Sequence, residues 1–153
     1  MREMKKSKLD IGSFFMICLG MYTLVISFLW IFLTEIMFVS DFAHYTGLTY
    51  QQYLASDPLF AQMYIITKKL IGIMLLGIGC SILIITKKSY SKGEKWSWFA
   101  LFILGSITWG TFIIYKIIIG YIGASMATFA VGAALLVVGL LLPIKEFISK
   151  NTT

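Results

Sequence analysis

Long runs of apolar residues, separated by short polar segments, dominate the chain. Four stretches lack Asp, Glu, Lys and Arg over a length that suits a helix crossing a bilayer: residues 11–33, 70–86, 96–115 and 121–142. About 20 helical residues span the roughly 30 Å of hydrocarbon in a membrane. The runs are apolar on every side rather than alternating, which favours helices over the strands of an outer-membrane barrel. We therefore predict four transmembrane helices.

The third and fourth stretches are separated by a single charged residue, Lys116, with no polar loop around it. Because no single helix of their combined length fits a bilayer, the chain must turn between Lys116 and Ser125, where Gly120 and Gly123 make a turn inexpensive. Lys116 lies about 30 Å along a helix from residue 96. We therefore expect Lys116 at the outer interface, with its ammonium group reaching into water.

The composition excludes several classes of protein. Apolar residues make up 59% of the 153 positions, charged residues make up 13%, and the mean hydropathy is +0.88, which one water-soluble core of this size could not bury. A soluble enzyme, a disordered chain and a secreted disulfide miniprotein are excluded. The net charge of +6 is attributed to loop residues, so no nucleic-acid partner is expected.

The positions of the cations predict the orientation. Ten of the thirteen Lys and Arg residues lie in the N-terminal segment, the second connection or the tail: Arg2, Lys5, Lys6, Lys8, Lys87, Lys88, Lys92, Lys95, Lys145 and Lys150. The first connection, residues 34–62, has three acidic residues and no Lys or Arg. The positive-inside rule therefore places both termini in the cytoplasm, in a multi-pass protein of the plasma (cytoplasmic) membrane. Trp30 is expected to anchor the outer interface, and Trp96 and Trp98 the inner one.

The longest segment outside the spans, residues 34–69, is rich in aromatic residues. Asp57 followed by Pro58 is typical of a helix start, so the second helix is expected to begin before it enters the membrane. Residues 49–55 suit a further short helix. The predicted fold is one all-α membrane domain over residues 1–153: an antiparallel four-helix transmembrane bundle with an aromatic, partly helical outer cap between helices 1 and 2.

Small residues mark the expected helix contacts, because helices in lipid associate through close backbone approach and interhelical hydrogen bonds. Each span carries one stripe of them, and the residues expected at the contacts are Gly20, Ser27, Gly72, Gly79, Ser106, Gly110, Thr128 and Gly132. Packing within the chain is favoured, and contacts between two copies are the alternative.

Ionisable side chains are concentrated in and beside the predicted cap. The candidate polar or ligand-binding cluster is Glu35, Asp41, His44, Tyr45, Asp57, Lys68 and Lys69. The spacing matches no metal signature, and neither a metal site, a cofactor nor a catalytic residue is predicted. These residues are interpreted as solvated or cap-stabilising, with a ligand or catalytic role as the alternative.

The segment Ser91 to Leu101, with the sequence SKGEKWSWFAL, resembles small uncharacterised prokaryotic four-helix integral membrane proteins. In those proteins a basic residue, Gly, Glu, a basic residue and Trp-x-Trp open the third helix. A Gly-Leu-Thr turn at Gly47 to Thr49 and the Asp57–Pro58 pair are also similar. The resemblance implies the four-helix topology and carries no activity.

Packing stripes with little chemistry favour a non-catalytic protein that binds a lipid-like ligand under its outer cap or serves as an accessory subunit of a membrane complex. The expected partners are membrane lipids, with another membrane protein or a second copy as further candidates. One alternative is an oligomeric transporter or channel subunit with hydroxyls from Thr23, Ser27, Ser106 and Thr111. A second alternative is an enzyme acting on a lipid or isoprenoid, with Glu35, Asp41 and His44 as its acid or base groups.

Overall fold

Helices are the regular secondary structure of residues 7–120 and 123–148, which the computed structural model describes. They are α1 (Lys8–Phe32), α2 (Thr34–Thr46), α3 (Tyr50–Ser56), α4 (Pro58–Lys88), α5 (Lys95–Ile119), α6 (Ala124–Leu141) and α7 (Ile144–Ile148), and a 3₁₀ turn, η1 (Tyr90–Lys92), precedes α5. The predicted start of the last span at residue 121 lies outside the described residues, as do Arg2, Lys5, Lys6 and Lys150.

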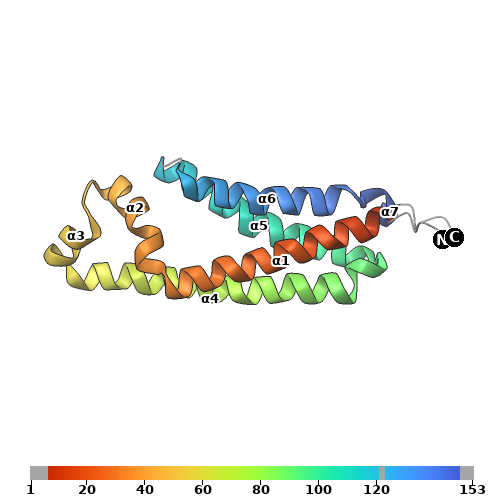
Figure 1. The fold of residues 1–153 in the computed structure, drawn as a ribbon, viewed down its shortest axis with the longest axis horizontal. Helices are drawn as coiled ribbons and strands as arrows, with labels where there is room; N and C mark the ends of the chain where they lie inside the picture. Colours follow the sequence, from red (N-terminus) through yellow and green to blue (C-terminus); the bar gives the residue numbers. More distant parts are fainter. Residues whose placement is uncertain (1–6, 121–122, 149–153) are drawn as a thin grey trace, which may run out of the picture.

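The four longest of these helices, α1, α4, α5 and α6, lie side by side, and each runs opposite to the one before it (Figure 1). Helix α1 packs closely on α4 and α6, and α5 packs on α6, whereas α4 and α5 make few contacts with each other. Helix α4 has 31 residues and is about 46 Å long, so its first turns project beyond α1 and carry α2 and α3 beside them. This part is called the α2–α3 end below.

Local capping explains where the helices begin and end. The Asp57 carboxylate accepts a hydrogen bond from the Phe60 backbone N–H at 3.1 Å, and Pro58 occupies the first position of α4. Thr49 and Gln52 form a capping box at the start of α3. Helix α5 ends at Gly120, whose φ of 72° lies in the left-handed region, so the chain turns there toward α6.

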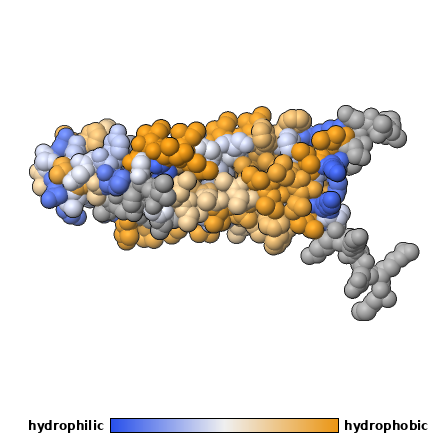
Figure 2. Space-filling model, turned by 90° about the horizontal axis from the view of Figure 1, so that it is seen from above, coloured by the Kyte–Doolittle hydropathy of each residue, from blue (hydrophilic) through white to orange (hydrophobic). Residues whose placement is uncertain are grey.

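The sides of the molecule are apolar and its ends are polar. Three helical segments are long and apolar enough to cross a membrane: α1, Pro58–Lys92, which comprises α4 and the turn after it, and α5. Helix α6 contains a shorter apolar stretch, Met126–Leu141. In the view of Figure 2 hydrophobic residues cover the middle, and hydrophilic residues gather at the α2–α3 end and at the opposite end. This distribution is the one expected of a protein whose middle contacts lipid.

Small residues allow α1 and α4 to approach closely. A Cβ atom added to Gly20 would lie 2.7 Å from Leu83, and one added to Gly79 would lie 2.8 Å from Leu24. The Ser27 hydroxyl donates to the Gly72 carbonyl oxygen at 2.8 Å. The small residues predicted on these two helices therefore lie at their mutual contact.

Helix α5 uses a different face from the predicted one. Ser106 is exposed, and a Cβ on Gly110 would meet no atom within 4 Å, whereas a Cβ on Gly105 would lie 2.3 Å from Leu136 of α6. Successive helical residues point about 100° apart, so a shift of one position turns the stripe away from its partner. On α6, the Gly132 backbone lies under the Trp109 ring, and the Thr128 carbonyl accepts a hydrogen bond from the Tyr22 hydroxyl at 2.8 Å.

Candidate ligand site between α4 and α5

A buried ion pair joins α2 to α5 at the α2–α3 end. Lys116 Nζ lies 2.6 Å from both Oδ1 and Oδ2 of Asp41, and the two side chains are 1% and 2% exposed. Lys116 belongs to the last turn of α5, where a cation is favoured by the helix dipole. A charge removed from water in this way is stable only with such a partner. The pair therefore fixes α2 against the end of α5.

Lys68 is a second buried cation in the same region. Its side chain is 7% exposed, and Nζ donates a hydrogen bond to the Tyr115 hydroxyl at 2.8 Å. The ammonium also lies 4.4 Å from the centre of the Tyr115 ring and 5.3 Å from that of Tyr64. Both distances are within the range of a cation–π interaction. Lys68 thus connects α4 to α5 where few other contacts join these helices.

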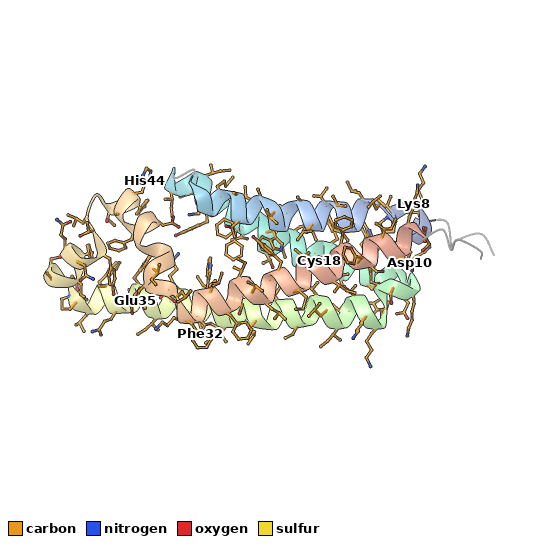
Figure 3. All side chains as sticks on the ribbon, in the orientation of Figure 1. Lys8, Asp10, Cys18, Phe32, Glu35 and His44 are labelled. Carbon is orange, nitrogen blue, oxygen red and sulfur yellow. The ribbon has the colours of Figure 1, made fainter. Side chains whose placement is uncertain are left out.

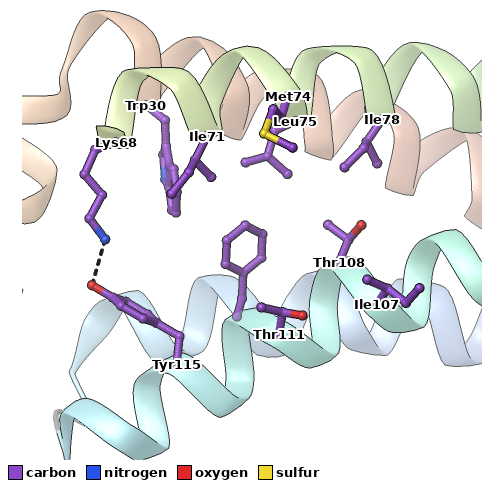
Figure 4. A pocket seen from close by; sticks show the side chains of 11 residues that line it. Trp30, Lys68, Ile71, Met74, Leu75, Ile78, Ile107, Thr108, Thr111 and Tyr115 are labelled. Carbon is purple, nitrogen blue, oxygen red and sulfur yellow. Dashed lines mark hydrogen bonds between the residues drawn. The ribbon is translucent and has the colours of Figure 1, made fainter. Parts of the chain in front are cut away.

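A groove of about 320 Å³ runs between α4 and α5 from this contact (Figure 4). Helix α4 contributes Ile71, Met74, Leu75 and Ile78 to its wall, and Trp30 of α1 lies at its back. From α5 it is lined by Ile107, Thr108, Thr111, Phe112 and Tyr115. The Thr108 hydroxyl donates to the Leu104 carbonyl of its own helix at 2.7 Å, which leaves the lining almost entirely apolar. The groove suits a hydrocarbon chain.

A second cavity, of about 390 Å³, lies at the α2–α3 end, and its mostly apolar lining includes more hydroxyl-bearing side chains than that of the groove. Its walls include Asp41, Phe42, Tyr45, Thr46, Tyr53, Phe60, Tyr64, Ile118 and Ile119. Lys68 and Tyr115 line this cavity as well as the groove, so their hydrogen bond stands between the two spaces. The apolar groove and a cavity with several hydroxyl-bearing side chains therefore meet at one lysine–tyrosine contact.

Of the predicted polar cluster, two members are buried in this region, Asp41 and Lys68. Tyr45 is exposed and lines the second cavity, Asp57 caps α4, and Lys69 is exposed. Glu35 and His44 are exposed at opposite ends of α2, about 14 Å apart along the helix (Figure 3). In the described ranges no group of three His, Cys, Asp or Glu side chains is placed to hold a metal ion.

The site also contains residues that the predicted polar cluster did not include, namely Lys116, Tyr115 and Tyr64. Lys116 was expected to reach into water, and this expectation is wrong, because its ammonium turns inward to Asp41. A signal was present, since Lys116 directly follows an uncharged span and Asp41 lies in the middle of an aromatic segment, and opposite charges near apolar surroundings tend to pair. The sequence does not show that α2 folds back onto the end of α5.

The tryptophans occupy unequal environments. Trp30 was expected to face the outer interface, but its side chain is 2% exposed and packs edge-on against Phe112, with ring centres 5.2 Å apart. Its ring fills the space between α1, α5 and α6, so core packing prevails over interfacial placement. Trp96 is exposed and donates to the Glu94 carboxylate at 2.7 Å, and half-buried Trp98 donates to the Leu140 carbonyl oxygen at 3.1 Å.

The hydroxyl residues considered for a pore have separate positions. Thr23 and Ser27 are fully buried and donate to backbone carbonyl oxygens, Thr23 to that of Leu19. Ser106 is exposed, and Thr111 lines the groove. They do not share a cavity among those found in the described residues.

Comparison of the chain with protein-family models, with curated proteins and with solved structures gives no significant match. The resemblance carried by residues 91–101 therefore stays a prediction, and the chemistry of the site is the basis for assigning a function.

Proposed function

We propose that this chain is a small multi-pass integral membrane protein that binds a lipid-like ligand between α4 and α5, under an outer cap formed by α2 and α3. The observation that carries the proposal is that Lys68 and Tyr115 line both the apolar groove and the second cavity, whose lining includes several tyrosine hydroxyls. A ligand with a hydrocarbon chain in the groove would place its polar end beside these groups. Its chain would occupy the groove, and its polar end would lie beneath the cap.

The spacing of charged residues supports a bilayer around the four long helices. From Lys95 to Lys116 along α5 the rise is about 31 Å, and from Lys68 to Lys87 along α4 it is about 29 Å. Both lengths match the roughly 30 Å of membrane hydrocarbon. Lys68 and Lys116 then lie near one boundary, and the groove lies in the adjoining half of the bilayer.

The cations at the other end support the predicted orientation. Lys8, Lys87, Lys92, Lys95 and Lys145 all belong to the end opposite α2 and α3. Under the positive-inside rule this end faces the cytoplasm, so the chain would cross four times with both termini inside. The cap and the polar end of the ligand would then face outward.

Binding without catalysis is proposed because the candidate acid and base groups differ in environment: Asp41 is buried, whereas Glu35 and His44 are exposed. Lys116 holds Asp41 in an ion pair, while Glu35 and His44 are exposed elsewhere on α2. General acid–base catalysis needs such groups within hydrogen-bond reach of one reacting atom. The groove offers binding surface and one cation in place of such a set.

Native mass spectrometry of protein purified in mild detergent tests the proposal. Thr111→Trp places a large ring in the groove and should remove most of the co-purified lipid. Ser106→Trp is the matched control, since Ser106 lies on the exposed part of the same helix outside the groove, and it should retain the lipid. Equal lipid retention by both variants, or wild-type protein without lipid, would contradict the proposal.

A further inference from the structure

We propose that two copies of this chain associate through an exposed stripe of α4, with the two α4 helices parallel and in contact along their length. The residues of this stripe, called the α4 stripe below, are alternately four and three positions apart: Leu59, Met63, Ile66, Leu70, Ile73, Gly77, Cys80 and Ile84. The groove and the second cavity are lined by other residues of α4. The inference is therefore separate from the ligand site, and it rests only on the membrane placement proposed above.

The α4 stripe lies on the side of the helix that faces away from the bundle. Its eight residues are exposed, whereas Leu75 and Ile82 on the opposite side are buried, and α4 forms one edge of the bundle (Figure 1). Steps of four and three average 3.5 residues, which is the repeat of a left-handed coiled coil. Such a stripe stays in contact with a parallel neighbour over many turns. From Leu59 to Ile84 it is about 38 Å long.

Helix α4 is longer than the hydrocarbon is thick, so part of the stripe lies outside the lipid. With Lys68 at the boundary, the ten residues before it extend about 15 Å beyond. There Leu59, Met63 and Ile66 are 78%, 54% and 65% exposed, since α2 and α3 pack beside these turns without covering the stripe. Lipid tails cover the stripe inside the membrane but do not reach these three side chains. Contiguous apolar side chains exposed to water mark a surface for protein contact.

A second copy of the chain fits this surface. Two copies inserted in the same direction have parallel α4 helices, and a two-fold axis along the membrane normal places each residue of the stripe opposite its own counterpart. Apolar side chains therefore meet apolar side chains throughout. Lys69 lies beside the stripe, at a position that faces Met74 of the partner subunit in a parallel pair, so the two lysines do not oppose each other. A different protein would need a matching stripe, which a second copy supplies.

The middle of the stripe allows the two backbones to approach closely. Gly77 and Cys80 are small, and a Cβ atom added to Gly77 would meet no atom of its own chain within 4 Å. The Ser81 hydroxyl beside them donates to the Gly77 carbonyl oxygen at 2.8 Å, so this polar group needs no partner from the second copy. Two helices can close together at Gly77, whereas a ring of three or four would leave a hole there. We therefore expect a dimer.

Oxidative cross-linking in native membranes tests the inference, because Cys80 belongs to the stripe and is exposed. In the parallel pair Cys80 faces its counterpart, and a disulfide forms where two Cα atoms approach to about 4.4–6.8 Å. The chain with Cys18→Ser keeps Cys80 as its one cysteine. Treated with copper phenanthroline and air, it should migrate as a disulfide-linked dimer on a non-reducing gel.

The matched control moves the cysteine to α5 at a similar depth. It combines Cys18→Ser and Cys80→Ser with Ile103→Cys. Ile103 is 55% exposed and lies eight positions from Lys95, as Cys80 lies seven positions from Lys87. Random collisions in the membrane affect both cysteines alike, so the α5 variant should remain a monomer.

Two further variants test the part of the stripe outside the lipid. Met63→Cys in the chain without Cys18 and Cys80 should also cross-link, about 25 Å along the helix from Cys80. Ile66→Glu in the Cys80 chain places two carboxylates opposite each other and should abolish the dimer. Gln52→Glu is its control, because it adds a carboxylate at the same end in a capping box that accepts Glu equally well.

The outcomes separate the α4 dimer from the ligand site. Equal cross-linking through Cys80 and through Ile103→Cys, or none through Cys80, would refute the dimer. If Met63→Cys remains monomeric, or if Ile66→Glu still dimerises, the contact does not follow the stripe and the inference is wrong. Native mass spectrometry of the unoxidised protein should give the mass of two chains, and a mass of one, three or more would overturn it. Lipid retention by Thr111→Trp and Ser106→Trp is measured independently, so failure of the dimer leaves the proposed function standing.

Discussion

Breaking the Asp41–Lys116 pair from one side should destabilise the protein much more than replacing both partners. Asp41→Leu leaves the Lys116 ammonium, which is 1% exposed, without its carboxylate. Lys116→Met does the converse and leaves the carboxylate buried. In the double variant both charges are gone, and two apolar side chains of similar size meet in their place.

The expected magnitudes follow from the geometry. At 2.6 Å and an effective dielectric constant of about 20, the attraction between the two charges is about 6 kcal/mol. The cost of removing the two ions from water is several kcal/mol each, so the net contribution of the intact pair is small. Either single variant should therefore lose about 3–5 kcal/mol of unfolding free energy, while the double variant should match the wild type or exceed it by about 1–4 kcal/mol.

Unfolding in mixed micelles with increasing sodium dodecyl sulfate, followed by tryptophan fluorescence, gives the free energies for a double-mutant cycle. Lys69→Met is the control, because it removes an exposed cation and should change the stability by less than about 1 kcal/mol. A coupling energy below about 1 kcal/mol would mean that the pair behaves as an exposed salt bridge. The burial of the pair, and its role in fixing α2 to α5, would then be refuted.

Three further predictions test the packing, the orientation and a surface hydrogen bond. Gly132→Ala should cost about 1–3 kcal/mol in the same titration, because its Cβ would lie 2.2 Å from an indole ring, whereas Gly110→Ala, with open space, should be neutral or gain up to about 1 kcal/mol. Tyr50→Cys should react with a membrane-impermeant maleimide on intact cells, and reaction only after lysis would contradict the orientation. Hydrogen bonds from Ser89 and a neighbouring indole lower the pKa of Glu94 from its usual 4.5. These hydrogen bonds should therefore stabilise the fold fully above pH 4.5, and their contribution should disappear as the pH falls through the lowered pKa of the folded state. Because Trp96 donates to the Glu94 carboxylate, its fluorescence should change over the same pH range, and Glu94→Gln should abolish this change.

The sequence predicts the helices of this protein well where local signals decide. The start of α4 at Pro58 follows from a cap and a first-turn proline, and the end of α5 at Gly120 follows from a residue that tolerates positive φ. Each of these signals acts within a few residues. The helix over Thr34–Thr46 was missed as a helix because its aromatic and polar residues show no clear period.

The sequence does not predict which side of α5 contacts α6. In a soluble helix the apolar face identifies the buried side, but α5 is apolar all round, so hydrophobicity does not distinguish its faces. Small residues were the remaining indication of the contact face, and Gly105 and Gly110 are both small residues of α5. The choice depends on the shape of the partner, because Leu136 of α6 needs the space above Gly105.

The site was only partly predictable because its main contact joins residues that are 75 positions apart. In the sequence, Lys116 has the pattern of a lysine at the membrane interface, and Asp41 has that of a solvated acid in a connection. For either residue taken alone, exposure to water has the lower free energy. As a pair they can be buried, because their mutual attraction offsets most of the cost of removing both charges from water, but only if α2 folds back over the end of α5. The same arrangement places Lys68 beside Tyr115, where the groove and the second cavity meet. The sequence therefore indicates that ionisable residues gather in and beside residues 34–69, while the fold determines which of them are buried and which of them pair.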